Sequence, residues 1–90
     1  MATIEIYLSP FCGFCYRAKQ LLDGKQAAYT EFNILMNSAK RDEMLSRAGG
    51  RHTVPQIFIN DMHIGGCDEL YALERAGDLD PLLIEDGLAS

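Results

Sequence analysis

The stretch TIEIYLSPFCGFC, residues 3–15, decides the fold. Residues 3–8 are rich in β-branched side chains, and Ile4 and Ile6 alternate with polar or aromatic neighbours, which predicts a strand. Ser9 and Pro10 then end the strand. Proline suits a first helical turn and serine suits an N-cap, so this junction predicts a strand that leads directly into a helix.

Two cysteines three residues apart, Cys12 and Cys15, stand at this junction. Residues at this spacing share one side of a helix, so their sulfurs can bridge. Cys12 falls in or just before the first turn, where unpaired N–H groups and the positive end of the helix dipole favour thiolate over thiol. Cys15 lies on the apolar stripe that runs towards Gly24, where burial favours the neutral thiol. The pair therefore predicts one attacking and one resolving sulfur.

Other uses of these cysteines fit the sequence less well. Two ordinary core cysteines would not require a position at a strand–helix junction, which is typical of redox motifs. A structural zinc site needs four ligands, usually in two close pairs. The chain offers only one close pair, with Cys67, His52 and His63 scattered elsewhere. We therefore predict thiol chemistry and no metal site formed by this chain alone.

Length and charge bound the function further. The 90 residues predict one domain, 1–90, with a net charge of -5. Residues 1–51 carry seven Lys or Arg against five acids, whereas residues 52–90 carry one against eight. Nucleic acids and anionic membranes need a cationic surface, so neither is an expected partner. The N-terminus lacks the pattern of a signal peptide, and we expect a cytoplasmic protein.

The remaining sequence predicts three more strands and three more helices. The strand candidates are residues 28–34, 56–59 and 62–64. The helix candidates follow caps at Asn37 or Ser38, at Asp68, and at Asp80. The order β-α-β-α-β-β-α-α predicts an α/β fold, in which a four-stranded mixed sheet is flanked by helices.

Two further motifs have both a structural and a functional interpretation. Thr53-Val54-Pro55 opens a strand, and proline is common at a strand edge. Gly65-Gly66-Cys67-Asp68 can be simply a turn and a helix cap. Alternatively, the backbone N–H groups there bind a carboxylate while Asp68 binds an ammonium. These two charges together would suit an amino-acid-like ligand.

The Cys12–Cys15, 53–56 and 65–68 motifs together resemble the glutaredoxins, and the small bacterial dithiol members above all. The resemblance covers nearly the whole chain and implies a thioredoxin fold with a cis bond before Pro55. It also implies a glutathione site. The residues assigned to this site are Phe14, Thr53, Val54, Pro55, Gln56, Gly66, Cys67 and Asp68, together with Arg17 from the helix that follows the cysteines.

The chain departs from the family pattern at two places. Many members carry a lysine where this chain has Ser9, so Arg17 or Lys19 would have to supply the missing charge, unless Arg17 is simply a solvated helix residue. Dithiol members usually have Pro-Tyr between the cysteines, whereas this chain has Gly-Phe, as in monothiol members that carry iron–sulfur clusters. Glycine loosens the helix start. A [2Fe–2S] cluster held by Cys12 and glutathione across a dimer is therefore the alternative.

The resemblance implies a glutathione-dependent oxidoreductase that acts as a monomer on disulfide-bonded or glutathionylated proteins. Cys12 would attack the disulfide, Cys15 or glutathione would resolve the product, and an NADPH-dependent reductase would recycle glutathione. The alternatives are the cluster carrier, which would be a dimer, and a thioredoxin-like reductase that does not use glutathione. The glutathione-dependent oxidoreductase and the thioredoxin-like reductase both require an anionic, accessible sulfur at Cys12.

Overall fold

The computed structural model describes residues 2–84, which form a four-stranded mixed sheet flanked by helices. The strands are β1 (Ile4–Leu8), β2 (Thr30–Asn33), β3 (Gln56–Ile59) and β4 (Met62–Gly65). Their order across the sheet is β2-β1-β3-β4, with β1 parallel to β2, and with the β1–β3 and β3–β4 pairs antiparallel. The predicted element order and sheet type are thus confirmed. β2 begins later than the predicted residue 28.

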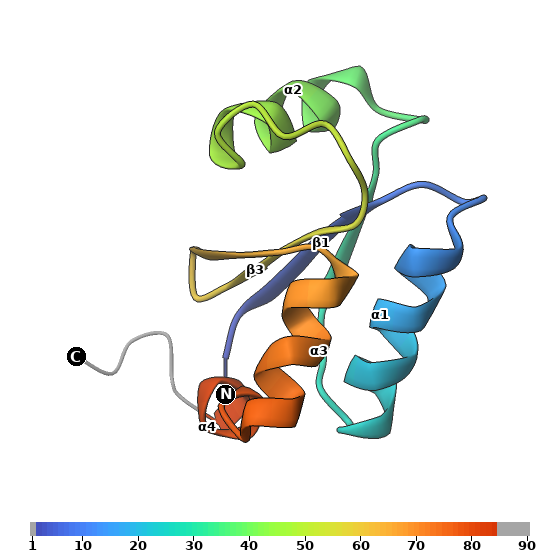
Figure 1. The fold of residues 1–90 in the computed structure, drawn as a ribbon. Coiled ribbons are helices and arrows are strands. Elements are labelled where there is room, and N and C mark those ends of the chain that lie inside the picture. Colours follow the sequence, from blue (N-terminus) through green and yellow to red (C-terminus); the bar gives the residue numbers. More distant parts are fainter. Residues whose placement is uncertain (1, 85–90) are drawn as a thin grey trace.

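Helices cover both faces of the sheet (Figure 1). They are α1 (Gly13–Gly24), α2 (Ser38–Arg47), α3 (Cys67–Ala76) and α4 (Leu79–Ile84). Alternation along β1 explains the two layers, because Ile4, Ile6 and Leu8 pack with buried residues of α1 and α3. Tyr7 points the other way and packs with Met44 of α2. The bond between Val54 and Pro55 is cis, as the resemblance implied.

Three predicted helix caps were wrong. Ser9 does not cap α1, because the Sγ of Cys12 accepts the N–H of Cys15 at 3.2 Å and fills that role. Asp68 does not cap α3, whose N-cap is Gly66. Asp80 lies inside α4 and does not cap it, and its carboxylate instead pairs with the ammonium of Lys25 at 2.6 Å.

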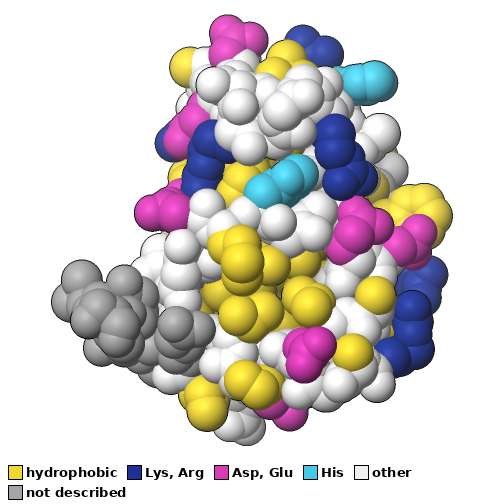
Figure 2. All heavy atoms as spheres, turned by 60° about the vertical axis from the view of Figure 1, so that its left-hand side comes forward, with side chains coloured by type: hydrophobic (Ala, Val, Ile, Leu, Met, Phe, Trp, Pro, Cys, Tyr) yellow, Lys and Arg dark blue, Asp and Glu magenta, His cyan; other side chains and the backbone are white. Residues whose placement is uncertain are grey.

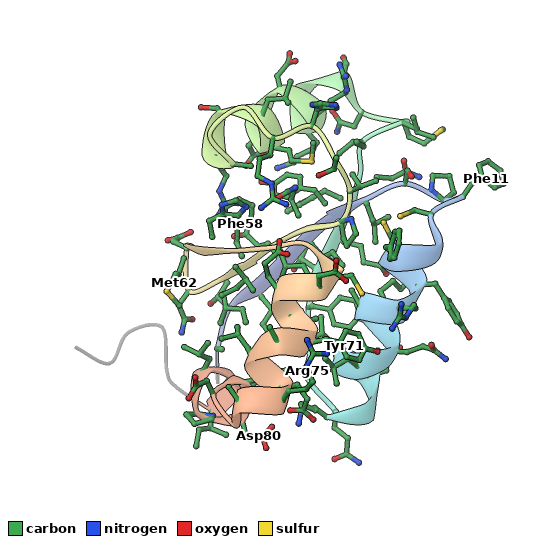
Figure 3. The ribbon with its side chains drawn as sticks, viewed as in Figure 1. Phe11, Phe58, Met62, Tyr71, Arg75 and Asp80 are labelled. Carbon is green, nitrogen blue, oxygen red and sulfur yellow. The ribbon has the colours of Figure 1, made fainter. Side chains whose placement is uncertain are left out.

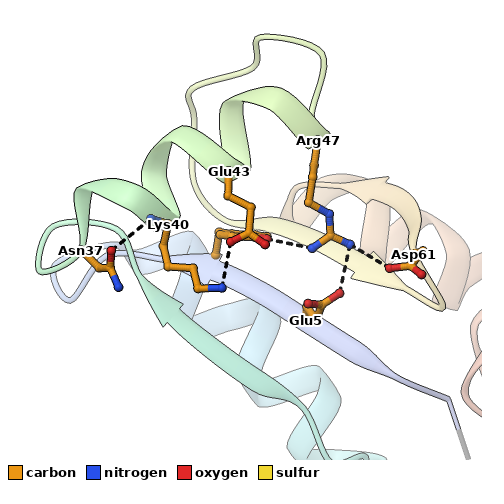
Figure 4. Close-up of polar contacts among 7 residues, drawn as sticks. Glu5, Asn37, Lys40, Glu43, Arg47 and Asp61 are labelled. Atoms are coloured by element: carbon orange, nitrogen blue, oxygen red, sulfur yellow. Dashed lines mark hydrogen bonds and ion pairs between the residues drawn. The ribbon is translucent and has the colours of Figure 1, made fainter.

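Polar side chains fasten α2 to the sheet (Figure 4). Of the two predicted candidates, Asn37 caps α2, and its Oδ1 accepts the N–H of Lys40. At the other end of α2, Arg47 donates to the hydroxyl of Tyr7 at 2.8 Å and to Glu5 at 3.0 Å. The Arg47 guanidinium also lies 4.0 Å from the centroid of the Phe58 ring. These contacts fix the end of α2, from which the chain returns towards Pro55 and β3.

A shallow apolar recess lies on the face formed by β4, α3 and α4, where Figure 2 shows hydrophobic side chains gathered. Its volume is about 410 Å³, and its lining includes Met62, Ile64, Leu73 and Leu82. We call it the β4 recess. Among the described residues, no helix is long and apolar enough to cross a membrane.

Candidate active site

Cys12 occupies the end of the loop between β1 and α1, and its side chain is partly exposed. Its Sγ accepts the N–H of Cys15 at 3.2 Å, and it lies 3.6 Å from the carbonyl oxygen of Val54. The N–H of Cys15 and the positive end of α1 can stabilise negative charge on the sulfur, whereas the Val54 carbonyl oxygen accepts a hydrogen bond from the protonated thiol. The prediction that a helix begins directly after this cysteine is confirmed.

Cys15 lies one turn deeper and is buried, with 2% of its surface exposed. Burial raises the pKa of the Cys15 thiol to about 12, and the hydrogen bond and charge of Cys12 add to the rise. Cys15 is therefore a neutral thiol at neutral pH. The two sulfurs differ as the sequence predicted: one is accessible and supported by a backbone N–H, and the other is buried and protonated.

A cavity of about 260 Å³ lies beside Cys12. It is open to solvent and is formed where the first turn of α1, the segment before β3 and the start of α3 meet. Seven of the residues that the resemblance assigned to glutathione line it: Phe14, Thr53, Val54, Pro55, Gly66, Cys67 and Asp68. The structure thus brings together residues that lie far apart in the sequence.

Two charged residues that the sequence analysis missed complete the cavity, namely Arg51 and Glu69. Their side chains form an ion pair at 3.3 Å. The carboxylate of Glu69 also accepts the N–H of Gly66 at 2.7 Å, and this hydrogen bond is the main reason why the pKa of Glu69 is lowered. The spacing of Glu69, three residues after the N-cap, is that of a capping box and was the available signal. For Arg51, the only available signal in the sequence was its position two residues before Thr53.

Gln56 and Arg17 do not line this cavity. The Gln56 side chain is fully buried, donates to the carbonyl oxygen of Thr53 at 2.9 Å, and lies 2.7 Å from Nε2 of His63. It therefore supports Thr53 from behind. The Arg17 guanidinium stacks over the Tyr71 ring at 5.4 Å. Neither residue faces the space that glutathione was expected to fill.

Cys67 lines the cavity but is buried, with 4% of its surface exposed. Burial raises the pKa of its thiol, although the charge of Arg17 opposes the rise. Cys67 is thus a packed, protonated thiol, less available than Cys12. Within residues 2–84, no three His, Cys, Asp or Glu side chains form a group that could hold a metal ion.

Comparison with known proteins decides the family. The family model described as Glutaredoxin matches residues 4–64, two thirds of the chain. The chain belongs to the glutaredoxin family. It is 57% identical to glutaredoxin 3 of Escherichia coli (strain K12) over 83 residues, which are 92% of this chain and 99% of that protein. A probable glutaredoxin of Synechocystis sp. is 51% identical over 82 residues, 91% of this chain and 93% of that protein.

Solved structures agree with this assignment. The crystal structure of a buckwheat glutaredoxin–glutathione complex superimposes with a TM-score of 0.86 at 33% identity, over 99% of this chain and 83% of that one. The solution structure of glutaredoxin from Brucella melitensis gives 0.79 at 49% identity, over 92% of this chain and 89% of that one. This glutaredoxin has a thioredoxin-like fold, carries the Cys12–Cys15 dithiol, and is a glutathione-dependent disulfide reductase similar to glutaredoxin 3.

Proposed function

We propose that this glutaredoxin reduces protein disulfides and protein–glutathione mixed disulfides, with Cys12 as nucleophile and Cys15 as resolving thiol. The observation that carries the proposal is the contrast between the partly exposed Cys12 and the buried Cys15. Exchange requires a thiolate that the partner sulfur can reach. Of the three cysteines, Cys12 meets this requirement best, because Cys15 and Cys67 are buried and their thiol pKa values are raised.

With a glutathionylated protein, the Cys12 thiolate attacks the glutathione sulfur. A Cys12–glutathione disulfide forms while the protein thiolate leaves and takes up a proton. The thiolate of a second glutathione then attacks this disulfide, which releases glutathione disulfide and restores the Cys12 thiolate. An NADPH-dependent reductase returns glutathione disulfide to two glutathiones.

With a protein disulfide, Cys12 first forms a mixed disulfide with one protein sulfur, and the other leaves as a thiolate. Cys15 then loses its proton and attacks Cys12, which releases the reduced protein and forms the Cys12–Cys15 disulfide. Once Cys12 is in a mixed disulfide it carries no charge, so part of the cause of the raised Cys15 pKa is removed. Two glutathiones then reduce the Cys12–Cys15 disulfide.

The cavity beside Cys12 has the charges that glutathione requires. Glutathione carries two carboxylates and one ammonium, and the cavity offers Arg51, Asp68 and the backbone around Gly66 at the start of α3. A helix N-terminus binds a carboxylate through its free N–H groups. We therefore assign the γ-glutamyl end to the backbone of Cys67, in the first turn of α3, and to Asp68, and the glycine carboxylate to Arg51. The superposition on the buckwheat glutathione complex supports a glutathione site in this chain.

Partners and location follow from the same chemistry. The expected partners are glutathione and proteins that carry a disulfide or a glutathione adduct, and the chain acts as a monomer in this reaction. We place it in the cytoplasm, because the proposed reaction draws on glutathione and NADPH, and reducing compartments keep such thiols reduced.

Two serine variants test the assignment of roles. Cys12→Ser should abolish the reduction of both kinds of substrate, because no other described cysteine is similarly accessible. Cys15→Ser should retain much of the activity on a protein–glutathione mixed disulfide but lose most of its activity on an intramolecular protein disulfide. Full activity in Cys12→Ser would contradict the proposal. Equal losses on both substrates in Cys15→Ser would contradict the resolving role.

A second candidate function is that of a glutathione-ligated [2Fe–2S] carrier. Cys12 is the one described cysteine exposed enough to ligate a shared cluster, so the remaining ligands would come from glutathione and a second chain. Gly13 favours this function, because glycine loosens the first turn of α1 and lets Cys12 point outward. Anaerobic purification with a visible spectrum tests it: a coloured dimer supports the carrier, and a colourless monomer argues against it.

A further inference from the structure

A chain of hydrogen bonds leads from β4 to the cavity beside Cys12, which we call the glutathione cavity. Its middle member is Gln56 of β3, which is fully buried although its side chain is an amide. The amide nitrogen donates to the carbonyl oxygen of Thr53 at 2.9 Å and to the Thr53 hydroxyl at 3.2 Å. The amide oxygen lies 2.7 Å from Nε2 of His63. A buried amide is costly unless its polar atoms are paired, so all of these contacts matter to the fold.

The acceptors around Gln56 decide how its amide is oriented. A carbonyl oxygen can only accept a hydrogen bond, so the group that faces Thr53 must be the amide nitrogen. The amide oxygen therefore faces His63, and the His63 ring must carry a proton on Nε2 in order to donate to it. Burial and the charge of Arg51 lower the pKa of His63, so at pH 7 the ring is neutral and carries a single N–H. That N–H lies on the nitrogen that faces Gln56.

Packing holds the His63 ring in this position. In the β3–β4 pair, His63 lies opposite Phe58, which shares a face of β3 with Gln56 because strand residues two apart point the same way. The two rings stack, with centroids 4.9 Å apart and planes at 25°. Phe58 is itself buried on the side of the sheet that α2 covers (Figure 3). The imidazole is thus fixed by its ring face, and its Nε2 is left to meet the amide.

Thr53 carries this order into the glutathione cavity. Thr53, Val54 and Pro55 line the cavity and precede β3. The carbonyl oxygen of Thr53 is bonded to Gln56, whereas that of Val54 lies 3.6 Å from Sγ of Cys12. The peptide bond between Thr53 and Val54 is trans, so its C=O and N–H point in opposite directions. Holding the Thr53 carbonyl against Gln56 therefore turns the N–H of Val54 away from Gln56.

We propose that His63 is a positioning residue for the glutathione moiety of the substrate. His63 orients the Gln56 amide, and the amide fixes the Thr53–Val54 peptide plane that the glutathione backbone meets. His63 does not line the glutathione cavity, so it acts through Gln56 and not by touching the substrate. The inference rests on the proposed function, because it requires a glutathione moiety in the cavity beside Cys12. If Nε2 of His63 is removed, the amide loses the donor that orients it and can turn away from Thr53.

Three substitutions of His63 separate the hydrogen bond from the packing. Glutamine places its side-chain nitrogen close to where Nε2 of histidine lies, so His63→Gln can still donate to Gln56. His63→Asn carries the same amide on a chain one carbon shorter and does not reach. His63→Phe keeps an aromatic ring against Phe58 but has no donor.

The first measurement is the reduction of the mixed disulfide of glutathione with 2-mercaptoethanol, coupled to NADPH oxidation. We expect its KM to rise about fivefold in His63→Asn and His63→Phe, the effect of losing one neutral hydrogen bond, while kcat stays within about twofold of wild type. His63→Gln should keep a KM close to that of wild type. A role in stability alone would not divide the three variants according to whether they can donate to Gln56.

The second measurement uses dipyridyl disulfide, which contains no glutathione and releases an absorbing pyridinethione when Cys12 attacks it. All three variants should react with it at the wild-type rate, because the cysteine and the helix start behind it are unchanged. Met62→Ala is the matched control. Met62 precedes His63 in β4, is exposed and lines the β4 recess, but it pairs with Ile59 and not with Phe58. This control should behave as wild type with both disulfides.

Two results would overturn the inference. One is an equal KM for the glutathione substrate in the three His63 variants. The other is an equal loss of rate with both disulfides in His63→Asn and His63→Phe, because Cys12 itself would then be disturbed. Failure of the proposed function has a different signature: wild type would react with dipyridyl disulfide but would not reduce the glutathione mixed disulfide, and the inference would fail with it.

Discussion

Arg51 gives the sharpest test of the glutathione cavity. Among the described residues that line this cavity, Arg51 is the one with a positive charge. The carboxylate of its partner Glu69 also accepts a hydrogen bond from the N–H of Gly66. The side chains of Arg51 and Glu69 are 47% and 44% exposed, so solvent screens any contact that they make with a ligand. We therefore expect Arg51→Gln to remove about 0.2–1 kcal/mol of binding energy, the range for exposed ion pairs.

That loss corresponds to a rise of about 1.4- to fivefold in KM for a glutathione mixed disulfide, with kcat nearly unchanged. Steady-state kinetics at low and high salt measure it, and the difference from wild type should shrink as salt screens the charge. Arg75→Gln is the control, because it removes the same charge from the last turn of α3. If Arg75→Gln raises KM as much as Arg51→Gln does, only net charge matters, and the assigned contact is refuted.

Two further predictions concern stability. Burial lowers the pKa of His63 from 6.5. As the pH falls, His63 therefore takes up a proton at a higher pH in the unfolded chain than in the folded one. The free energy of unfolding should therefore keep its full value above about pH 6.5 and fall as the pH drops below it. Urea titrations should show a smaller fall in His63→Gln than in wild type. Gly65 has a φ of +118°, and an added Cβ would lie 2.9 Å from Cγ of Glu69 and closer still to its carboxylate. Gly65→Ala should thus lower the urea midpoint clearly. Gly24→Ala should not lower it, because nothing lies within 4 Å of a Cβ added at Gly24. Equal midpoints in these two variants would contradict this reasoning.

The sequence predicted best what depends on local spacing. The strand before Cys12, the helix after it and the cap at Asn37 are all set by neighbours within a few residues. The difference between Cys12 and Cys15 was also predictable, because Cys12 stands just before the first turn of α1, whereas Cys15 lies one turn deeper on its apolar stripe. The caps predicted at Ser9 and Asp68 were wrong because another group at the same junction supplies the cap.

What the sequence could not predict depends on contacts between distant segments. Arg51 and Glu69 are 18 residues apart, and only the fold brings them together. The resemblance to the glutaredoxins assigned Gln56 to the glutathione site, but strand alternation turns its side chain into the protein.

Alkylation of the native protein tests the central claim most directly, namely that Cys12 is the accessible nucleophile. The reduced protein would be treated with limiting iodoacetamide at pH 7, and the modified peptides would be quantified by mass spectrometry over time. We expect carbamidomethyl on Cys12 well before Cys15 or Cys67, because burial raises the pKa of the latter two thiols. Labelling of Cys15 or Cys67 as fast as Cys12 would contradict the account.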